Sequence, residues 1–393
     1  MNMLHYIFQN PLLPLAVVSL VTLLVYIALR YPLYRLPHFA VTPQDGTYDG
    51  PLSVIVVTHN DGATLRDCIE AIEAQQYAPG FEIIVVNDNS DDDTPDIIKL
   101  MQGRYSNIRS TFTPSTARSL SHSKLAVTLG VKSARYDWIL LTDGGCRPES
   151  DRWMATMAAR MTEEKDFVLG YVNFAAGGGL WGRRLRLGRL MAQLRYVHAL
   201  GVKQTRHPFG SSHGNLALRR SIFLDGKGFY PYLNQLGGDD LLLINHLGQA
   251  GRCAATMEPD AIVRQAVPAL HQSWRTYRLS ESEAMRHLDR KAQLKRLYWG
   301  LSTLCYWIYL VSMLAVIVLL LTEGLYIPAA CALLVILLEQ AASTGMLTAT
   351  AKRLGESASW PSLPVYTLLQ PCYTAYYKLV SRRHRRDLLR GES

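Results

Sequence analysis

Carboxylates stand at two points of the chain where they would face a bound ligand. Asp143 ends the apolar run "WILLT" and is followed by two glycines, and Asp239 and Asp240 open the helical pattern "DDLLLINHL". A carboxylate at a strand end suits a divalent cation, and a carboxylate in a cleft suits proton removal from a hydroxyl group. Each acid also has a structural explanation, because Asp143 can cap the next turn and a helix start favours negative charge.

Strands and helices that would position these acids alternate along the first part of the chain. Apolar runs that predict strands lie at 52–60, 81–90 and 136–143. Segments with helical spacing lie at 63–77, 93–101 and 123–134. This alternation predicts a parallel sheet with right-handed crossovers, whose ligand lies beyond the carboxyl ends of the strands. Polar residues stand at those ends, namely Thr58, Asn60, Asp88 and Asp143.

Three uncharged apolar segments are long enough to cross a membrane. They are residues 11–29, 298–321 and 324–338, the last extending to about 347. Basic residues gather at one end of each segment, namely Arg30 and Arg35, then Lys291, Lys295 and Arg296, then Lys352 and Arg353. Since basic residues favour the cytoplasmic side, residues 31–297 are predicted to lie in the cytoplasm.

The expected domains are an anchor at 1–35, a soluble domain at 50–290, membrane helices at 291–348 and a final region at 349–393. That final region holds an apolar stretch, 361–380, with three prolines, and a basic tail. We expect the stretch to lie in the interface or to re-enter. The segment 181–200 mixes arginines with leucines and predicts either a helix resting on anionic lipid or a solvated basic helix.

The bulk composition agrees with a protein that is part soluble and part membrane-embedded. The chain has 393 residues, 49% of them hydrophobic, and a net charge of +9. Basic residues near an anionic leaflet account for this charge, so nucleic acid is not needed as a partner. The six cysteines form no zinc or disulfide pattern.

Four blocks in this order resemble the family-2 glycosyltransferases of the GT-A fold, in a membrane-anchored bacterial branch. The blocks are "LSVIVVTHNDGATLRDCIEAIEAQQY", "EIIVVNDNSDDDT", "SKLAVTLGVKSARYDWILLTDGGCRP" and "GNLALRRSIFLDGKGF". The resemblance covers roughly residues 50–290. It implies an α/β GT-A domain with a Rossmann-like mixed sheet that binds a nucleotide sugar.

The resemblance also implies roles for the donor-binding residues. Thr58, Asn60 and Asp88 would hold the nucleoside, Lys124 would contact the diphosphate, and Asp143 would hold Mg²⁺ or Mn²⁺ as the first acid of a D-x-D motif. The second acid of that motif is replaced by Gly145. This departure weakens a metal site that depends on two carboxylates.

Later blocks imply the sugar pocket and the base. "FGSSHGNLALRR" is similar to the family's pocket block, with His213, Gly214 and Asn215 as pocket residues. Asp240 matches the base that removes the acceptor hydroxyl proton, with Asp239 as its partner. The family's closing Q-x-x-R-W motif corresponds to Glu283, Arg286 and His287, where Glu replaces Gln. Arg286 would bind the diphosphate, and an amphipathic interfacial helix is the alternative for this segment.

We therefore expect an inverting glycosyltransferase in a bacterial inner membrane, with several spans and a cytoplasmic catalytic domain. Its partners would be a nucleotide-sugar donor, expected to carry uridine diphosphate, a lipid-linked or glycan acceptor and membrane lipids. Two alternatives stay open. One is a catalytically inactive membrane scaffold or nucleotide sensor, which Gly145 and Glu283 favour, and the other is a synthase of polyprenyl-phosphate glycosyl carriers.

Overall fold

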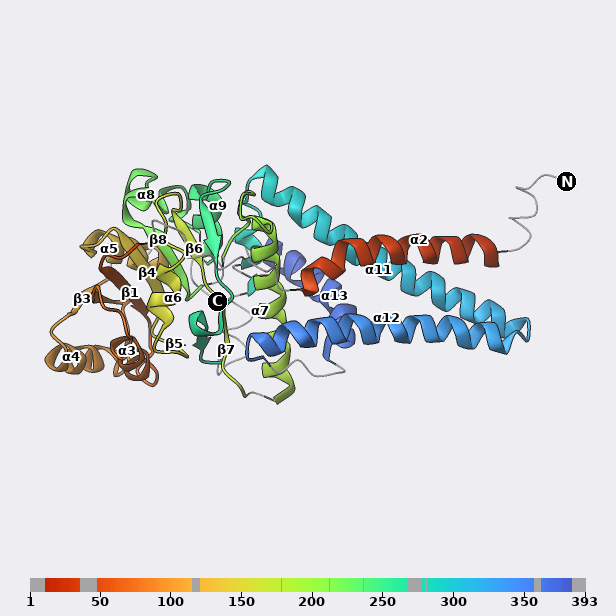
Figure 1. The fold of residues 1–393 in the computed structure, drawn as a ribbon, viewed down its shortest axis with the longest axis horizontal. Coiled ribbons are helices and arrows are strands. Elements are labelled where there is room, and N and C mark those ends of the chain that lie inside the picture. Colours follow the sequence, from red (N-terminus) through yellow and green to blue (C-terminus); the bar gives the residue numbers. More distant parts are fainter. Residues whose placement is uncertain are drawn as a thin grey trace. The chain divides into compact units, whose positions relative to one another are not determined.

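The central sheet of the computed structural model has seven strands (Figure 1). In spatial order they are β3 (Ile108–Phe112), β2 (Phe81–Asn87), β1 (Leu52–Thr58), β4 (Trp138–Asp143), β8 (Leu216–Arg219), β6 (Phe167–Leu169) and β9 (Cys253–Ala255). Every residue of β1 is buried, because its valine, leucine and isoleucine side chains pack on both faces. That burial is typical of a central parallel strand covered by helices on both sides.

Strand direction shows that the sheet is mixed. Strands β3, β2, β1 and β4 run parallel to one another, β8 is antiparallel to both β4 and β6, and β9 is parallel to β6. A second sheet has the order β5 (Cys146–Pro148), β10 (Val263–Gln265) and β7 (Val172–Phe174). The predicted mixed α/β architecture is therefore confirmed.

Helices connect these strands and cover the sheet. They are α3 (Leu65–Glu73), α4 (Thr94–Arg104), α5 (His122–Ser133), α6 (Trp153–Ala158), α7 (Gly179–Leu200), α8 (Arg220–Asp225) and α9 (Asp239–Leu247), with single 3-10 turns η2 (Tyr230–Tyr232) and η3 (Pro259–Ala261). The core between α3, α6 and the sheet contains two fully buried tryptophans, Trp138 and Trp153. The three helical segments predicted within residues 63–134 correspond to α3, α4 and α5.

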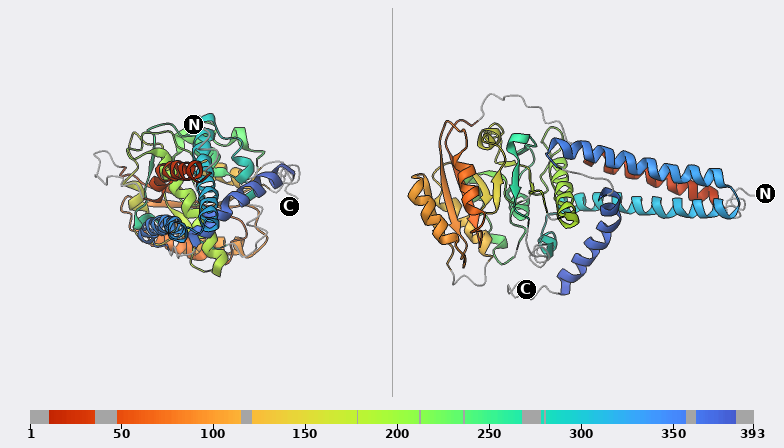
Figure 2. Two further views of the ribbon diagram at one scale, coloured as in Figure 1. Left: turned by 90° about the vertical axis from the view of Figure 1, so that its right-hand side faces the viewer. Right: turned by 90° about the horizontal axis from the view of Figure 1, so that it is seen from below.

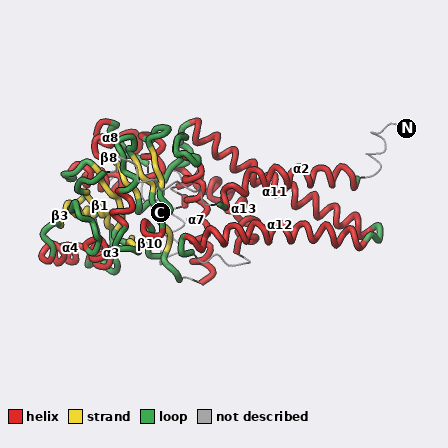
Figure 3. The backbone as a smooth tube through the Cα atoms, viewed as in Figure 1, coloured by secondary structure: helices red, strands yellow, loops and turns green. Residues whose placement is uncertain are grey.

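The chain divides into two units. The first comprises residues 1–36 and 293–371, and the second, which contains the sheets, comprises residues 37–292 and 372–393. The first unit contains α2 (Leu12–Arg30), the 3-10 turn η1 (Tyr31–Tyr34), most of α11 (Arg290–Thr322), α12 (Tyr326–Arg353) and the start of α13 (Ser362–Arg383). Figure 3 draws its described residues as helices joined by turns. Three of these segments, Leu12–Tyr34, Arg290–Thr322 and Tyr326–Arg353, are long and apolar enough to cross a membrane.

The three long helices pack against one another within their unit (Figure 2). Tyr26 of α2, Tyr306 and Tyr309 of α11 and Ile336 of α12 form one buried cluster, and Ser19 of α2 donates a hydrogen bond to Ser312 of α11 at 2.7 Å. The predicted number of candidate membrane helices, one near the N-terminus and two near the C-terminus, is confirmed. The apolar stretch 361–380 falls within the single helix α13, which contains Pro371. Its placement in the interface stays a prediction.

The structure describes residues 11–35, 48–114, 121–177, 179–211, 213–235, 237–267, 278–279, 281–356 and 362–383. Residues 384–393 of the basic tail lie outside this range. So do Trp274 and Tyr277, two aromatic residues that support the interfacial alternative for the segment around Arg286.

Candidate active site

The site is centred on Asp143, the last residue of β4. β4 pairs in parallel with β1, so Asp143 lies beside Val57 at the carboxyl edge of the sheet. Its Oδ1 is 2.8 Å from Nε2 of His213, and its Oδ2 is 3.9 Å from Sγ of Cys146. One edge of this carboxylate is therefore held by a histidine, while the other has only a weak thiol contact.

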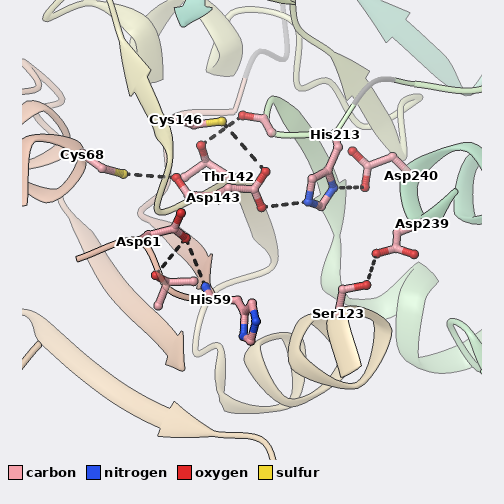
Figure 4. Close-up of polar contacts among 12 residues, drawn as sticks. His59, Asp61, Cys68, Ser123, Thr142, Asp143, Cys146, His213, Asp239 and Asp240 are labelled. Carbon is pink, nitrogen blue, oxygen red and sulfur yellow. Dashed lines mark hydrogen bonds and ion pairs between the residues drawn. The ribbon is translucent and has the colours of Figure 1, made fainter. Parts of the chain in front are cut away.

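His213 links the strand-end acid to the acid on α9 (Figure 4). Its Nδ1 is 3.6 Å from Oδ1 of Asp240. Burial alone would lower the pKa of His213, but the two carboxylates raise that pKa well above its ordinary value. The imidazole is therefore held as a cation between Asp143 and Asp240. From α7, Arg189 adds positive charge by donating to the His213 carbonyl oxygen at 2.8 Å.

Gly214 allows this loop to approach β4 closely. Its φ is +101°, and a Cβ at this position would lie 2.7 Å from Sγ of Cys146. Any larger residue would clash with the thiol and would be strained by the positive φ, so glycine is needed to bring His213 against Asp143. The positive φ and the nearby thiol of Cys146 are therefore the physical reasons why glycine is needed where this loop approaches β4.

Asp239 and Asp240 begin α9 after two glycines with positive φ, Gly237 and Gly238. A Cβ on Gly238 would lie 2.3 Å from Cβ of Ala284, so the segment 281–289 packs directly on this turn. Asp239 is held by Lys124, whose Nζ is 2.6 Å from its Oδ1, and by the hydroxyl of Ser123. Asp240 has a different environment, because its Oδ2 is buried without a hydrogen-bond partner.

The two adjacent acids consequently have pKa values shifted in opposite directions. Burial raises the pKa of Asp240, with Asp143 and Asp239 adding to the rise and His213 opposing it. Burial would also raise the pKa of Asp239, but Lys124, His213 and Ser123 outweigh it and lower that pKa. A pair whose pKa values are pushed apart is typical of residues with separate acid-base roles.

Asp88 is connected to the same region through the start of α5. Its Oδ1 accepts a hydrogen bond from Thr113 at 2.6 Å and lies 3.3 Å from Nδ1 of His122. His122 is followed by Ser123, which contacts Asp239. A continuous series of contacts therefore joins the carboxylates at 88, 239, 240 and 143, so the structure brings these predicted residues together.

The loop after β1 contributes an acid that sequence reasoning missed. Asp61 accepts hydrogen bonds through Oδ2 from the Thr58 hydroxyl at 3.0 Å and from the His59 amide at 3.1 Å. Its Oδ1 lies 3.5 Å from where a Cβ on Gly145 would be. A second carboxylate thus stands beside the glycine that replaces the second acid of D-x-D. Its place in the quoted stretch "THND" was the available signal.

The residues at this edge fit a divalent cation whose coordination shell is completed by oxygen atoms of the bound nucleotide and water. Among the described residues, no three histidine, cysteine or acidic side chains gather as a metal cage. Hard cations nevertheless accept oxygen atoms from phosphates and water, and Asp143 Oδ2 offers a carboxylate oxygen with no nitrogen or oxygen partner. Asp61 is the nearest candidate for a second carboxylate ligand.

Several predicted contacts are used elsewhere in the fold. Lys124 is completely buried, and its amine also donates to the carbonyls of Gln235 at 2.6 Å and Gly237 at 2.9 Å. In this geometry the amine holds Asp239 and the two carbonyls, and its contact with the diphosphate stays a prediction. The Thr58 hydroxyl likewise donates a hydrogen bond to Asp61, and Asn60 accepts a hydrogen bond from the Asp91 amide at 2.8 Å.

Asn215 is also built into the core rather than exposed in a pocket. Its amide donates to the carbonyls of Tyr171 and Ala261 and accepts from Trp153 Nε1, and it is fully buried. In this geometry the polar atoms of the side chain bond within the fold, and its contact with the sugar stays a prediction.

The closing segment is placed beside α9 and α13. Arg286 lies 2.7 Å from Oε2 of Glu283 and donates to the Lys378 carbonyl at 3.4 Å. His287 follows, half-buried, next to it. The structure therefore gives the arginine two partners within this segment and α13, and its contact with a diphosphate stays a prediction.

The arginines of α7 were expected to face lipid or water, and this is wrong for two of them. Arg186 and Arg189 are 8% and 7% exposed. Arg186 donates to the Ala175 and Gly177 carbonyls, and the Nε of Arg189 is buried without a partner. Periodicity could not reveal this, because the segment has leucines and arginines on all sides.

Residues 53–225 match the model of the family described as Glycosyl transferase family 2. This part of the chain is a family 2 glycosyltransferase domain. The match includes Asp61, Asp88, Asp143 and His213, and it ends before α9. The resemblance expected from the sequence is therefore confirmed.

One curated relative is the "Probable glycosyltransferase YdaM" of Bacillus subtilis (strain 168), which is 30% identical over 117 residues. That alignment covers 29% of this chain and 27% of the relative, so the chain spans about a quarter of the relative's length in the match. A solved structure, the mannosyltransferase PcManGT from Pyrobaculum calidifontis in complex with GDP-Man and Mn²⁺, is similar with a TM-score of 0.57 and 17% identity. The likeness covers 95% of this chain and 97% of that one, and it shows that the glycosyltransferase domain has a GT-A-like fold.

Proposed function

We propose that the protein is an inverting glycosyltransferase that moves a sugar from a nucleotide donor to a hydroxyl group of a membrane-near acceptor. The family match supports the reaction class, and the resemblance seen in the sequence favours uridine diphosphate as the carrier. The three apolar helices support an acceptor that is presented at a membrane, such as a lipid-linked sugar. Under this proposal the domain faces the cytoplasm of a bacterium.

The observation that carries the proposal is the environment of Asp240. Its Oδ1 is oriented by His213, while its Oδ2 is buried and has no partner. A buried carboxylate oxygen without a hydrogen bond is costly, and a hydroxyl donor from a substrate would remove that cost. Because its pKa is raised, Asp240 is also a stronger base than an ordinary aspartate.

In the proposed reaction, Asp240 Oδ2 accepts the proton of the acceptor hydroxyl. The oxygen of that hydroxyl forms a bond to the anomeric carbon of the donor, and the bond between this carbon and the diphosphate oxygen breaks. The diphosphate leaves with the electron pair. Attack from the side opposite the leaving group inverts the configuration of the anomeric carbon, so no covalent sugar intermediate is required.

Two other residues act on Asp240 indirectly. His213 fixes the orientation of its carboxylate and places positive charge beside Asp143. Lys124 and Ser123 neutralise and anchor Asp239, so only one of the two adjacent acids is free to take a proton. Asp88 would accept hydrogen bonds from the nucleoside, as the resemblance implies.

Asp143 Oδ2, with Asp61 beside it, would hold the Mg²⁺ or Mn²⁺ of this proposal. When bound, such a cation neutralises the charge that develops on the leaving diphosphate. Arg286 would add to this neutralisation if its ion pair with Glu283 opens toward the donor.

The test uses the purified full-length protein in detergent or nanodiscs with UDP- and GDP-linked sugars, in the presence of Mg²⁺ or Mn²⁺. We expect donor turnover, and we expect Asp240→Asn to lower it by about 10²- to 10⁴-fold with nucleotide affinity retained. Asp225→Asn is a matched control, because it makes the same chemical change at an exposed acid on α8 that forms none of the contacts around Asp240. Nucleotide binding without turnover of any donor would instead support the inactive scaffold, which Gly145 favours.

A further inference from the structure

The helical unit contains a buried positive charge that the proposed reaction does not use. Arg30, the last residue of α2, is 2% exposed. Its Nε donates to the Tyr34 hydroxyl at 3.2 Å, and its guanidinium carbon is 5.7 Å from the centre of the Tyr34 ring. Its Nη1 is buried and has no hydrogen-bond partner. Within the described part of the chain, no carboxylate forms an ion pair with this guanidinium.

Phenol groups surround this arginine. Tyr26 and Tyr34 are 2% and 0% exposed, and their hydroxyl oxygens are 3.3 Å apart. The turn that carries Tyr34 is tied to α12, because Thr350 donates a hydrogen bond to the Tyr34 carbonyl. The guanidinium therefore lies among donors contributed by α2 and η1 and supported by α12.

Glu339, a buried acid of this unit, has partners of its own. Glu339 of α12 accepts a hydrogen bond from Gln340 at 2.5 Å, and its backbone carbonyl accepts one from Tyr31 at 3.5 Å. Its Oε1 is buried without a partner. No ion pair joins Glu339 to Arg30, so among the described residues Arg30 has no counter-ion.

A charge buried between membrane helices without a partner is unfavourable, and such residues usually mark a binding site. An anion with several acceptor oxygens would satisfy both the charge and the free N–H of a guanidinium. The end of α2 that carries Arg30 is also the end predicted to lie at the cytoplasmic leaflet, where Lys352 and Arg353 are exposed. The anion available at that level in a membrane is a lipid phosphate.

We propose that Arg30, together with the hydroxyls of Tyr26 and Tyr34, binds the phosphate group of a membrane lipid. The proposal rests on residues of the helical unit alone, and only the identification of the phosphate as that of an acceptor rests on the proposed function. The phosphate has two sources with the same chemistry. It belongs either to a phospholipid that stabilises the helices or to an isoprenoid phosphate that serves as the acceptor or its carrier.

Native mass spectrometry of the full-length protein tests this site. The purified protein is titrated with a polyprenyl monophosphate, with phosphatidylglycerol and with diacylglycerol, which lacks phosphate. We expect one tightly held phosphate-bearing lipid and no comparable binding of diacylglycerol. Arg30→Met should weaken the phosphate-bearing lipid by about tenfold or more, as expected for the loss of one charge-assisted hydrogen bond. Arg353 is an exposed arginine of the same unit, so Arg353→Met should change the affinity for this lipid by less than about twofold.

Two further variants keep the test informative if Arg30→Met does not fold. Arg30→Lys retains the charge but not the planar fork of donors, so it should lower the lipid affinity less than Arg30→Met does. Tyr34→Phe removes the hydroxyl that orients the guanidinium and should also weaken binding. If the polyprenyl monophosphate binds about tenfold more tightly than phosphatidylglycerol, the site holds the isoprenoid phosphate of the acceptor or its carrier. If the two lipids bind equally, the site holds a phospholipid that stabilises the helices. Unchanged lipid binding in the Arg30 and Tyr34 variants, or equal binding of diacylglycerol, overturns the proposal, whatever the transfer assay shows.

Discussion

Replacing Lys124 by methionine should destabilise the glycosyltransferase domain in the absence of any nucleotide. The ammonium group of Lys124 is completely buried and bonds to Asp239 and to the carbonyls of Gln235 and Gly237. Methionine has a similar shape but no donor. The substitution therefore leaves the buried carboxylate of Asp239 without its counter-ion and two carbonyls without a partner.

The size of this effect follows from the burial of the pair. Removing one partner of a buried ion pair typically costs about 3–5 kcal/mol, because the remaining charge stays desolvated. For a domain of this size, each kcal/mol lowers the melting temperature by about 2–4 °C. We therefore expect Lys124→Met to lower the melting temperature of the domain by roughly 6–20 °C.

Thermal unfolding of the full-length protein in detergent, followed by tryptophan fluorescence, measures this change. Lys99→Met is the matched control, because Lys99 forms an ion pair with Asp96 in which both side chains are largely exposed. It should melt within about 2 °C of the wild type. The double variant Lys124→Met/Asp239→Asn should recover part of the loss, since it removes the unpaired charge as well.

The result that would refute this reasoning is specific. If Lys124→Met melts within about 2 °C of the wild type but binds nucleotide diphosphate at least about tenfold more weakly, Lys124 contacts the donor and not Asp239. The role predicted from the sequence would then be right, and the closed geometry around Asp239 would not represent the working enzyme.

Three other predictions concern the site. Because burial raises the pKa of Asp240 and a base acts only when deprotonated, kcat/KM should fall as the pH drops through a pKa above that of an ordinary aspartate, and a limb at the ordinary value would contradict the assignment. Asp61→Asn should weaken Mn²⁺ binding in the presence of UDP by about tenfold, measured by electron paramagnetic resonance, whereas an effect equal to that of the exposed control Asp96→Asn would exclude Asp61 as a ligand. Asn215→Ala removes three buried hydrogen bonds and should cost about 2–4 kcal/mol in thermal unfolding without raising the KM for the donor, while an unchanged melting temperature with a raised KM would restore its pocket role.

The strands, the first helices and the membrane spans were predictable because their signals are local. Continuous apolar runs identify β1, β2 and β4, and uncharged stretches of sufficient length identify the three long helices. The acids at strand ends were predictable for a related reason. Parallel strands end at the same edge of a sheet, so Asp88 and Asp143 had to lie near one another once the sheet formed.

The roles of individual polar side chains were less predictable, since they depend on which distant segment packs against them. Lys124 lies on α5 and was expected to contact the diphosphate, but its amine donates to the carbonyls of Gln235 and Gly237. Asn215 follows a glycine loop typical of a pocket, yet Trp153 and two carbonyls enclose it. For Asp61 the sequence offered only its place in the stretch "THND", because its position beside Gly145 exists only after β1 and β4 pair.

The amino-acid sequence by itself determined the elements of this protein, the order of its strands and helices, and the edge at which its acids gather. Those properties follow from hydrophobic periodicity and from the length of apolar segments, which act over a few neighbouring residues. Only the tertiary structure decided which acid keeps a free oxygen, which cation is buried and which arginine lacks a counter-ion. Solvation and charge pairing depend on contacts between residues far apart in the chain, as the pairs Lys124 with Asp239 and His213 with Asp143 show.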